Sequence, residues 1–178
     1  SPPPADRTKA ILADTDHFWG RGGTPEWVWK SFTRGYQPIF MDLDEPRFTK
    51  HLKPENREIS ASTRCAMGQA SVLARRAPLE TMLPVTEIAS SGYCLTNRTS
   101  EYVVYLPVDD YGSSRRTLAG KTLRFLFRKE MIKKMVTVDL SAATSRLSVE
   151  WFNVGTGEVI AAGTTTGGNI QNFAVPFN

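Results

Sequence analysis

The sequence predicts an α/β part followed by an all-β part. Residues 1–80 alternate short apolar segments with segments of helical periodicity, a pattern typical of strand–helix units in a parallel sheet. Residues 81–178 instead hold seven short segments rich in β-branched and aromatic residues, separated by turn residues. The length of 178 residues and the 40% hydrophobic content suit one domain or two small ones with a real core. We place the boundary between the two parts near residues 78–84.

The first part is predicted to form a β-α-β-α unit. Its expected strands and helices cover residues 9–13, 25–34, 37–41 and 54–76. Thr24 is a suitable N-cap for the first helix, and Pro25 occupies the first helical position, where its missing N–H costs nothing. Gly35 ends that helix, and Pro78 closes the second one. Because a strand–helix–strand crossover within one sheet is almost always parallel and right-handed, we expect the two strands to pair in parallel.

The second part is a candidate for a small antiparallel β-sandwich. Its expected strands cover residues 85–89, 93–96, 101–107, 135–140, 147–153, 158–162 and 171–175. The segment 153–158, with two glycines and an asparagine, carries the signal of a hairpin turn. We expect only antiparallel pairing in this part of the chain.

Positive charge is concentrated in one segment of the second part. Residues 111–134 hold eight Lys and Arg residues against the single acid Glu130, a net charge of +7, so the rest of the chain sums to −3 within a total of +4. A protein that binds nucleic acid along its whole surface would not have this distribution, so we expect no nucleic-acid partner. The segment 109–134 is therefore predicted to be a solvated insertion in the β part.

Membrane and disulfide features are sparse. No run approaches the ~18 apolar residues of a membrane-spanning helix, so no membrane association is expected. Residues 1–6 do not resemble a signal peptide, although a signal removed earlier is compatible with the sequence. Cys65 and Cys94 do not make a disulfide scaffold: free, buried thiols are the simpler expectation, and one bridge is the alternative.

Three motif blocks of the first part resemble a known enzyme family. Residues 14–20 read DTDHFWG, residues 27–35 contain WVWKSF and end in RG, and residues 38–42 read PIFMD. Together they are similar to the last two βα units of the apiosidase-like glycoside hydrolases, which are (β/α)₈ barrels. Many of these enzymes carry a C-terminal β-sandwich named for collagen binding. The second part is similar to that domain in residues 89–95, 101–107, 136–141, 149–153, 156–157 and 166–168.

The resemblance implies a partial (β/α)₈ barrel followed by an antiparallel β-sandwich. It further implies hydrolysis of a glycosidic bond in a polysaccharide or oligosaccharide, no cofactor, and an extracellular or periplasmic location. Two parallel strands are normally part of a larger sheet that is buried on both faces. We therefore expect the chain to be truncated at both ends, with the N-terminal portion of the barrel as its missing partner. The segment 109–134 departs from the family, which has a short turn there.

The candidate site residues follow the two predicted strands. By resemblance, Asp16 is the candidate catalytic carboxylate, and Asp14, His17, Trp19 and Asp42 are the candidate substrate-binding residues. Asp14 and Asp16 are two apart, so both would point to one face of an extended strand. The alternatives are turn capping by the aspartates and packing of Trp19 on the following helix. Metal binding is the weaker option, because no second His or Cys lies at ligand spacing, and we predict no metal site.

Two functions from different classes remain open. The first is the C-terminal part of a glycoside hydrolase that acts on a complex polysaccharide. A glycosidase needs two carboxyl groups, which a barrel draws from different strands, so this chain alone is not expected to hold a complete active site. The alternative is a non-catalytic carbohydrate- or protein-binding β-sandwich module. The upstream reading frame discriminates between them, because the enzyme requires six further strand–helix units.

Overall fold

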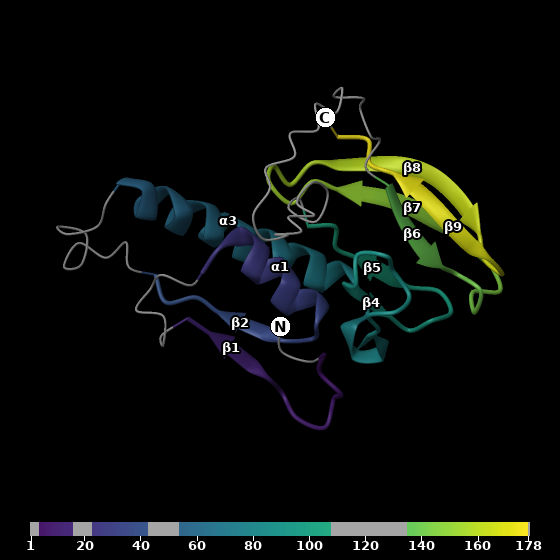
Figure 1. Cartoon of the computed structure of the whole chain (residues 1–178), viewed down its shortest axis with the longest axis horizontal. Helices are drawn as coiled ribbons and strands as arrows, with labels where there is room; N and C mark the ends of the chain where they lie inside the picture. The colour runs from purple at the N-terminus through teal and green to yellow at the C-terminus, as the bar shows by residue number, and fades with distance from the viewer. Residues whose placement is uncertain (1–3, 16–22, 43–53, 108–134, 178) are drawn as a thin grey trace, which may run out of the picture.

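The computed structural model describes residues 4–15, 23–42, 54–107 and 135–177, and it is a mixed structure of helices and mostly antiparallel strands (Figure 1). The elements, in chain order, are β1 (Leu12–Asp14), α1 (Pro25–Thr33), β2 (Gln37–Ile39), α3 (Pro54–Arg76), the 3₁₀ helix η2 (Leu79–Thr81), β3 (Leu83–Pro84), β4 (Cys94–Thr96), β5 (Tyr102–Val104), β6 (Met135–Asp139), β7 (Arg146–Phe152), β8 (Val159–Thr166) and β9 (Ile170–Ala174). The predicted insertion 109–134 lies outside the described residues.

Helix α1 begins and ends as its sequence predicts. Thr24 has extended backbone angles, and its side chain accepts a hydrogen bond from the backbone N–H of Trp27 at 3.1 Å. Pro25 is the first helical residue. Gly35 follows the helix with a φ of +76°, a conformation that glycine adopts without strain.

Strands β1 and β2 pair in parallel, which confirms the prediction for this pair. Leu12 lies opposite Gln37, and Asp14 lies opposite Ile39. Figure 1 places the two strands along one side of the molecule, with α1 next to β2 and α3 beyond α1. The helices thereby cover one face of the strand pair, while Leu12 and Ile39 on its other face are exposed.

Every strand pairing described in the β part is antiparallel, as expected. Strands β3, β4 and β5 form one sheet, while β6 pairs with β9 and β7 pairs with β8. The predicted hairpin connects β7 to β8: the Asn153 N–H donates to the Glu158 carbonyl at 2.8 Å, and Gly157 has a φ of +78°. The Asn153 side-chain oxygen also accepts from two backbone N–H groups of the turn.

The residues expected to form a strand over 85–89 divide between two sheets. The Val85 N–H donates to the Cys94 carbonyl at 2.8 Å, continuing the pairing of β3 with β4. Four residues later, Ala89 forms an antiparallel bridge with Val138 of β6. The expectation of one continuous strand was therefore wrong, because the segment leaves one sheet and joins the next.

Two hydrophobic clusters hold the described residues together. The first joins the two parts of the chain, since it contains Val28, Trp29 and Phe32 of α1, Ala66 and Ala70 of α3, and Met82, Leu95 and Tyr105 of the β part. The second lies within the β part, around β6 and residues 85–94. Trp29, only 2% exposed, is central to the first cluster, where its ring stacks on Tyr105 with centroids 6.3 Å apart. The β part thus packs directly on α1.

Candidate site at the carboxyl ends of β1 and β2

Two of the five candidate site residues, Asp14 and Asp42, are described by the structure. Asp16, His17 and Trp19 lie outside the described residues, so their predicted roles remain predictions. Around these two residues the structure describes the ends of β1 and β2, Gly23 before α1, and the side of α3 that carries Thr63 and Arg64.

Asp14 ends β1 on the face turned away from the helices. It lies opposite Ile39, which is 48% exposed, and on the same face as Leu12, which is 60% exposed. Asp14 is itself exposed. The carboxylate therefore sits at the edge of an open apolar surface and not inside the α/β core.

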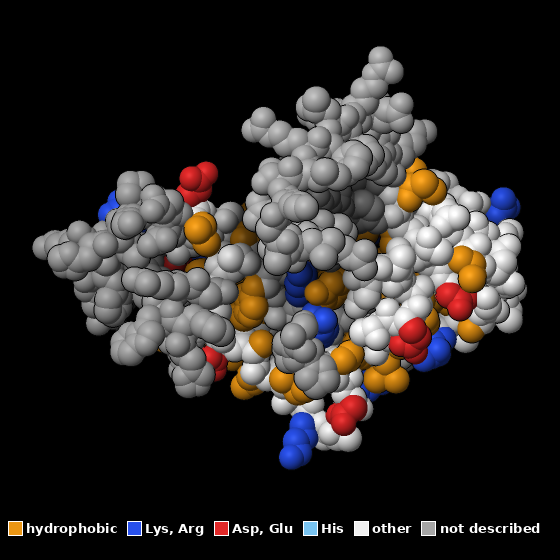
Figure 2. All heavy atoms as spheres, viewed as in Figure 1, with side chains coloured by type: hydrophobic (Ala, Val, Ile, Leu, Met, Phe, Trp, Pro, Cys, Tyr) orange, Lys and Arg blue, Asp and Glu red, His pale blue; other side chains and the backbone are white. Residues whose placement is uncertain are grey.

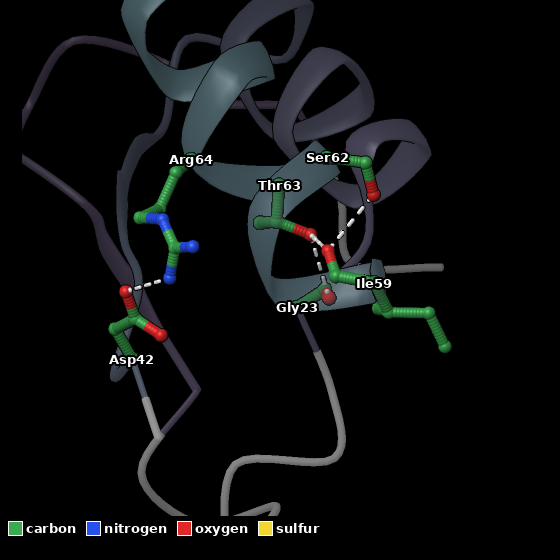
Figure 3. A network of polar contacts seen from close by, with 6 residues as sticks. All are labelled: Gly23, Asp42, Ile59, Ser62, Thr63 and Arg64. Atoms are coloured by element: carbon green, nitrogen blue, oxygen red, sulfur yellow. Dashed lines mark hydrogen bonds and ion pairs between the residues drawn. The ribbon is translucent and has the colours of Figure 1, made fainter. Parts of the chain in front are cut away.

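Asp42 lies on the other side of its strand, toward α3. Exposure alternates from Ile39 to Asp42, so that Met41 is exposed whereas Asp42 is half-buried. The Asp42 carboxylate accepts a hydrogen bond from Arg64 Nη1 at 2.6 Å and forms an ion pair with it (Figure 3). Asp14 and Asp42 thus share one end of the sheet but point to different sides. The partly exposed pair contributes about 0–1 kcal/mol to stability, and its main effect is to fix the direction of the carboxylate.

A buried threonine ties the two strand ends together. Thr15, the residue after β1, is fully buried, and its Oγ1 accepts the backbone N–H of Met41 at 2.9 Å. This bond extends the pairing of the strands by a side-chain contact beyond their last backbone pair. It fixes the spacing of the ends from which Asp14 and Asp42 project.

A second threonine anchors Gly23 to α3. The Thr63 hydroxyl lies 3.0 Å from the Gly23 carbonyl oxygen and 2.8 Å from the Ile59 carbonyl oxygen, two acceptors for its one proton (Figure 3). A Cβ on Gly23 would lie 2.4 Å from two ring carbons of Phe40, so any other residue there would force the Phe40 ring or the backbone to shift. Gly23 is thereby held between the end of β2 and α3.

Sequence reasoning did not find the residues that build this end of the sheet. Thr15 lies within the motif DTDHFWG, but the motif does not indicate its contact with Met41; Thr63 and Arg64 carry no recognisable motif, and Arg64 meets Asp42 only because α3 brings it to the end of β2. No pattern around Gly23 indicated the Phe40 ring that packs on it.

The described residues hold no group of three or more His, Cys, Asp or Glu side chains able to bind a metal ion together. Cys65 and Cys94 are both free; the first is exposed and the second is buried. In the described ranges, no helix has the length and apolar character needed to cross a membrane. Comparisons of the chain with protein-family profiles, with curated proteins and with solved structures found no match.

Proposed function

We propose that the chain is the C-terminal part of a glycoside hydrolase that acts on a complex polysaccharide outside the cytoplasm. In this proposal β1 and β2 are the last two strands of a (β/α)₈ barrel, and the β part is an accessory β-sandwich packed against it. Asp16 is the catalytic carboxylate, and Asp14, His17 and Trp19 contact the sugar; Asp42, expected from the sequence to do the same, instead points toward α3 and pairs with Arg64. The motif blocks quoted above supply the activity class.

The exposed face of β1 and β2 is the observation that carries the proposal. Leu12 of β1 and Ile39 of β2 are 60% and 48% exposed on a parallel strand pair, and Met41, two residues after β2, is 44% exposed. Parallel strands are almost always covered on both faces inside a larger sheet, whereas this pair is covered on one face by helices. The face of β1 and β2 that the helices leave uncovered is apolar. In a larger barrel that face would line the interior, which supports the proposal. Ligand-binding groups of such barrels gather at the carboxyl ends of the strands, where Asp14 and Asp42 lie.

The test uses the reading frame with its upstream sequence. The longer protein should cleave at least one member of a panel of plant and bacterial polysaccharides, measured as new reducing ends. Asp16→Asn and His17→Ala should each lower kcat/KM by about 100-fold, which corresponds to roughly 2.7 kcal/mol of transition-state stabilisation. Glu158→Gln, at an exposed carboxylate of the β7–β8 hairpin, is the control and should leave kcat/KM unchanged.

Two results would contradict the proposal. The first is an Asp16→Asn variant with full activity and a lower melting temperature, because that carboxylate would then be a turn-capping group. The second is a reading frame without strand–helix units upstream, which would favour the alternative of a non-catalytic binding module. Turnover by the 178-residue chain alone would also be unexpected, since the proposal draws the second carboxyl group from another strand.

A further inference from the structure

Two fully buried threonines lie at the two ends of the segment that carries three of the five candidate site residues. Thr15 is the last described residue before residues 16–22, and Thr63 of α3 contacts Gly23, the first described residue after them. Figure 2 shows charged side chains of both signs spread among hydrophobic and polar ones over the face in view, so the described charges there do not by themselves mark a site. The buried hydroxyls are the stronger functional indication.

Thr15 holds the first end of the segment. Its Oγ1 accepts the backbone N–H of Met41 at 2.9 Å. The register of β1 against β2 ends with Asp14 opposite Ile39, so this side-chain bond carries the alignment of the strands further along the chain. A valine would fill nearly the same volume as Thr15 but would leave the Met41 N–H without this acceptor, at the cost of an unmade hydrogen bond.

Thr63 and Phe40 hold the second end at Gly23. The Thr63 hydroxyl lies 3.0 Å from the Gly23 carbonyl oxygen, and the Phe40 ring occupies the space that a Cβ on Gly23 would need. That Cβ would also lie 3.5 Å from Thr15 Cγ2, so Thr15 and Gly23 are neighbours. Fixing both ends of a chain segment side by side removes much of the conformational freedom of the residues between them.

We propose that Thr15 and Thr63 are positioning residues for the proposed reaction. They hold both ends of the segment 16–22, so that Asp16 and His17 meet the sugar in a reactive geometry. This inference rests on the proposed function, which supplies the sugar and the catalytic role of Asp16. Both threonines are fully buried, so each acts through the backbone that it holds and not by touching the sugar. A displacement of about 1 Å at a reacting group can lower a rate about 100-fold, so such remote hydrogen bonds affect kcat.

The first measurement needs no activity and uses the 178-residue chain. It follows the ring signals of His17 by NMR in a His51→Gln background, where His17 is the only histidine left. Thr15→Val and Thr63→Val remove a hydroxyl but keep the branched shape, and each should shift the His17 signals. Thr63→Val is the sharper case, because Thr63 is far from His17 in the sequence. Thr15→Ser and Thr63→Ser keep the hydroxyl and should leave the signals close to those of the unsubstituted background.

Thr96→Val is the matched control. Thr96 is also fully buried, and its Oγ1 likewise accepts a backbone N–H, that of Arg98 at 2.7 Å, but it lies in β4 of the β part. This substitution removes the same kind of hydrogen bond and should leave the His17 signals unchanged. Thermal melts establish that each variant is folded at the temperature of the measurement.

The second measurement is the kinetics of the longer protein on the polysaccharide that it cleaves. Thr15→Val and Thr63→Val should each lower kcat by about tenfold or more and change KM by less than about threefold, because the geometry of the reacting groups matters most in the transition state. The two serine variants should restore most of kcat, and Thr96→Val should leave it unchanged. Assays well below each melting temperature keep a loss of folded protein out of kcat.

The two measurements separate this inference from the proposed function. His17 signals that ignore Thr63→Val, or that respond equally to Thr63→Val and Thr96→Val, would overturn the inference. Full kcat in both valine variants, with an inactive Asp16→Asn variant, would also reject it and leave the proposed function intact. His17 shifts confined to the Thr15 and Thr63 variants, without cleavage of any polysaccharide by the longer protein, would support the role of the threonines in holding the segment and reject the proposed function.

Discussion

Replacement of Trp29 tests whether the α/β part and the β part share one core. The side chain is 2% exposed and contacts Phe32 of α1, Tyr105 and Phe152, with ring centroids 6.1, 6.3 and 5.7 Å away. A tryptophan buries roughly 150–250 Å², worth about 4–6 kcal/mol of transfer free energy. Its Nε1–H is buried without an acceptor, and losing that group returns about 1–3 kcal/mol. Trp29→Ala should therefore lower the free energy of unfolding by about 3 kcal/mol and the melting temperature by roughly 6–12 °C.

A double-mutant cycle isolates the contact between the two parts. Trp29 is in α1 and Phe152 is in β7, so their interaction exists only if the β part packs on the helix. Urea unfolding of Trp29→Ala, Phe152→Ala and the double variant should give a coupling of about 0.5–1.5 kcal/mol. The control cycle pairs Trp29 with Phe173, which packs on the other cluster and should show additive effects. Additive effects of Trp29 and Phe152 would refute the shared core, and so would two separate unfolding transitions.

Three further predictions concern individual residues. Gly23→Ala should lower the free energy of unfolding by about 1–3 kcal/mol, because the new methyl group meets the Phe40 ring. The control Gly68→Ala, in open space on α3, should raise the free energy of unfolding by about 0.5–1 kcal/mol. Equal effects of the two substitutions in thermal melts would contradict the tight contact at Gly23. Burial is the largest effect on the Cys94 thiol and raises its pKa from 9.0 to about 12, so the folded state keeps a proton that the unfolded state releases. The resulting stability is complete below pH 9 and should be lost as the pH rises toward 12, a decline that urea unfolding should show to be shallower in Cys94→Ala. A thiol reagent at neutral pH should label Cys65 rapidly in the folded chain and Cys94 only after unfolding; fast labelling of both would contradict the burial.

Local sequence signals predicted the elements whose geometry is set by neighbouring residues. Thr24, Pro25 and Gly35 fixed the ends of α1, and the helix between them fixed the parallel direction of β1 and β2. The hairpin at residues 153–158 was likewise predictable, because its turn depends on neighbouring residues alone. Gly157 adopts the positive φ that the turn requires, and the Asn153 side chain accepts from backbone N–H groups within it. For these elements the prediction from sequence was confirmed.

Strand β8 shows where a local signal is ambiguous. Gly163 was expected to follow the strand, but β8 continues through it to Thr166. The glycine has a φ of +83°, and the register against β7 shifts between Ser148 and Glu150. It therefore marks a bulge and not a turn, and only the pairing with β7 distinguishes the two.

The direction of the Asp42 side chain shows why site prediction is harder than element prediction. Its position after β2 was predicted from sequence, and the structure places it there. Whether it faces a pocket or a helix depends on the packing of α3, which brings Arg64 to within 2.6 Å of the carboxylate. No pattern near Asp42 contains that information, because the partner is on a different element.

Helix α1 connects the proposed catalytic side of the molecule to the β part. Its buried face carries Trp29, whose ring contacts Tyr105 and Phe152, while the residue before its N-cap is Gly23, which Thr63 and Phe40 hold at the carboxyl ends of the strands. A helix anchored at both places cannot move without disturbing one of them. In the proposed enzyme the β part would therefore do more than follow the barrel as an appendage. It would hold α1 in place, and through Gly23 it would help to position the carboxyl ends of β1 and β2, where the candidate site lies.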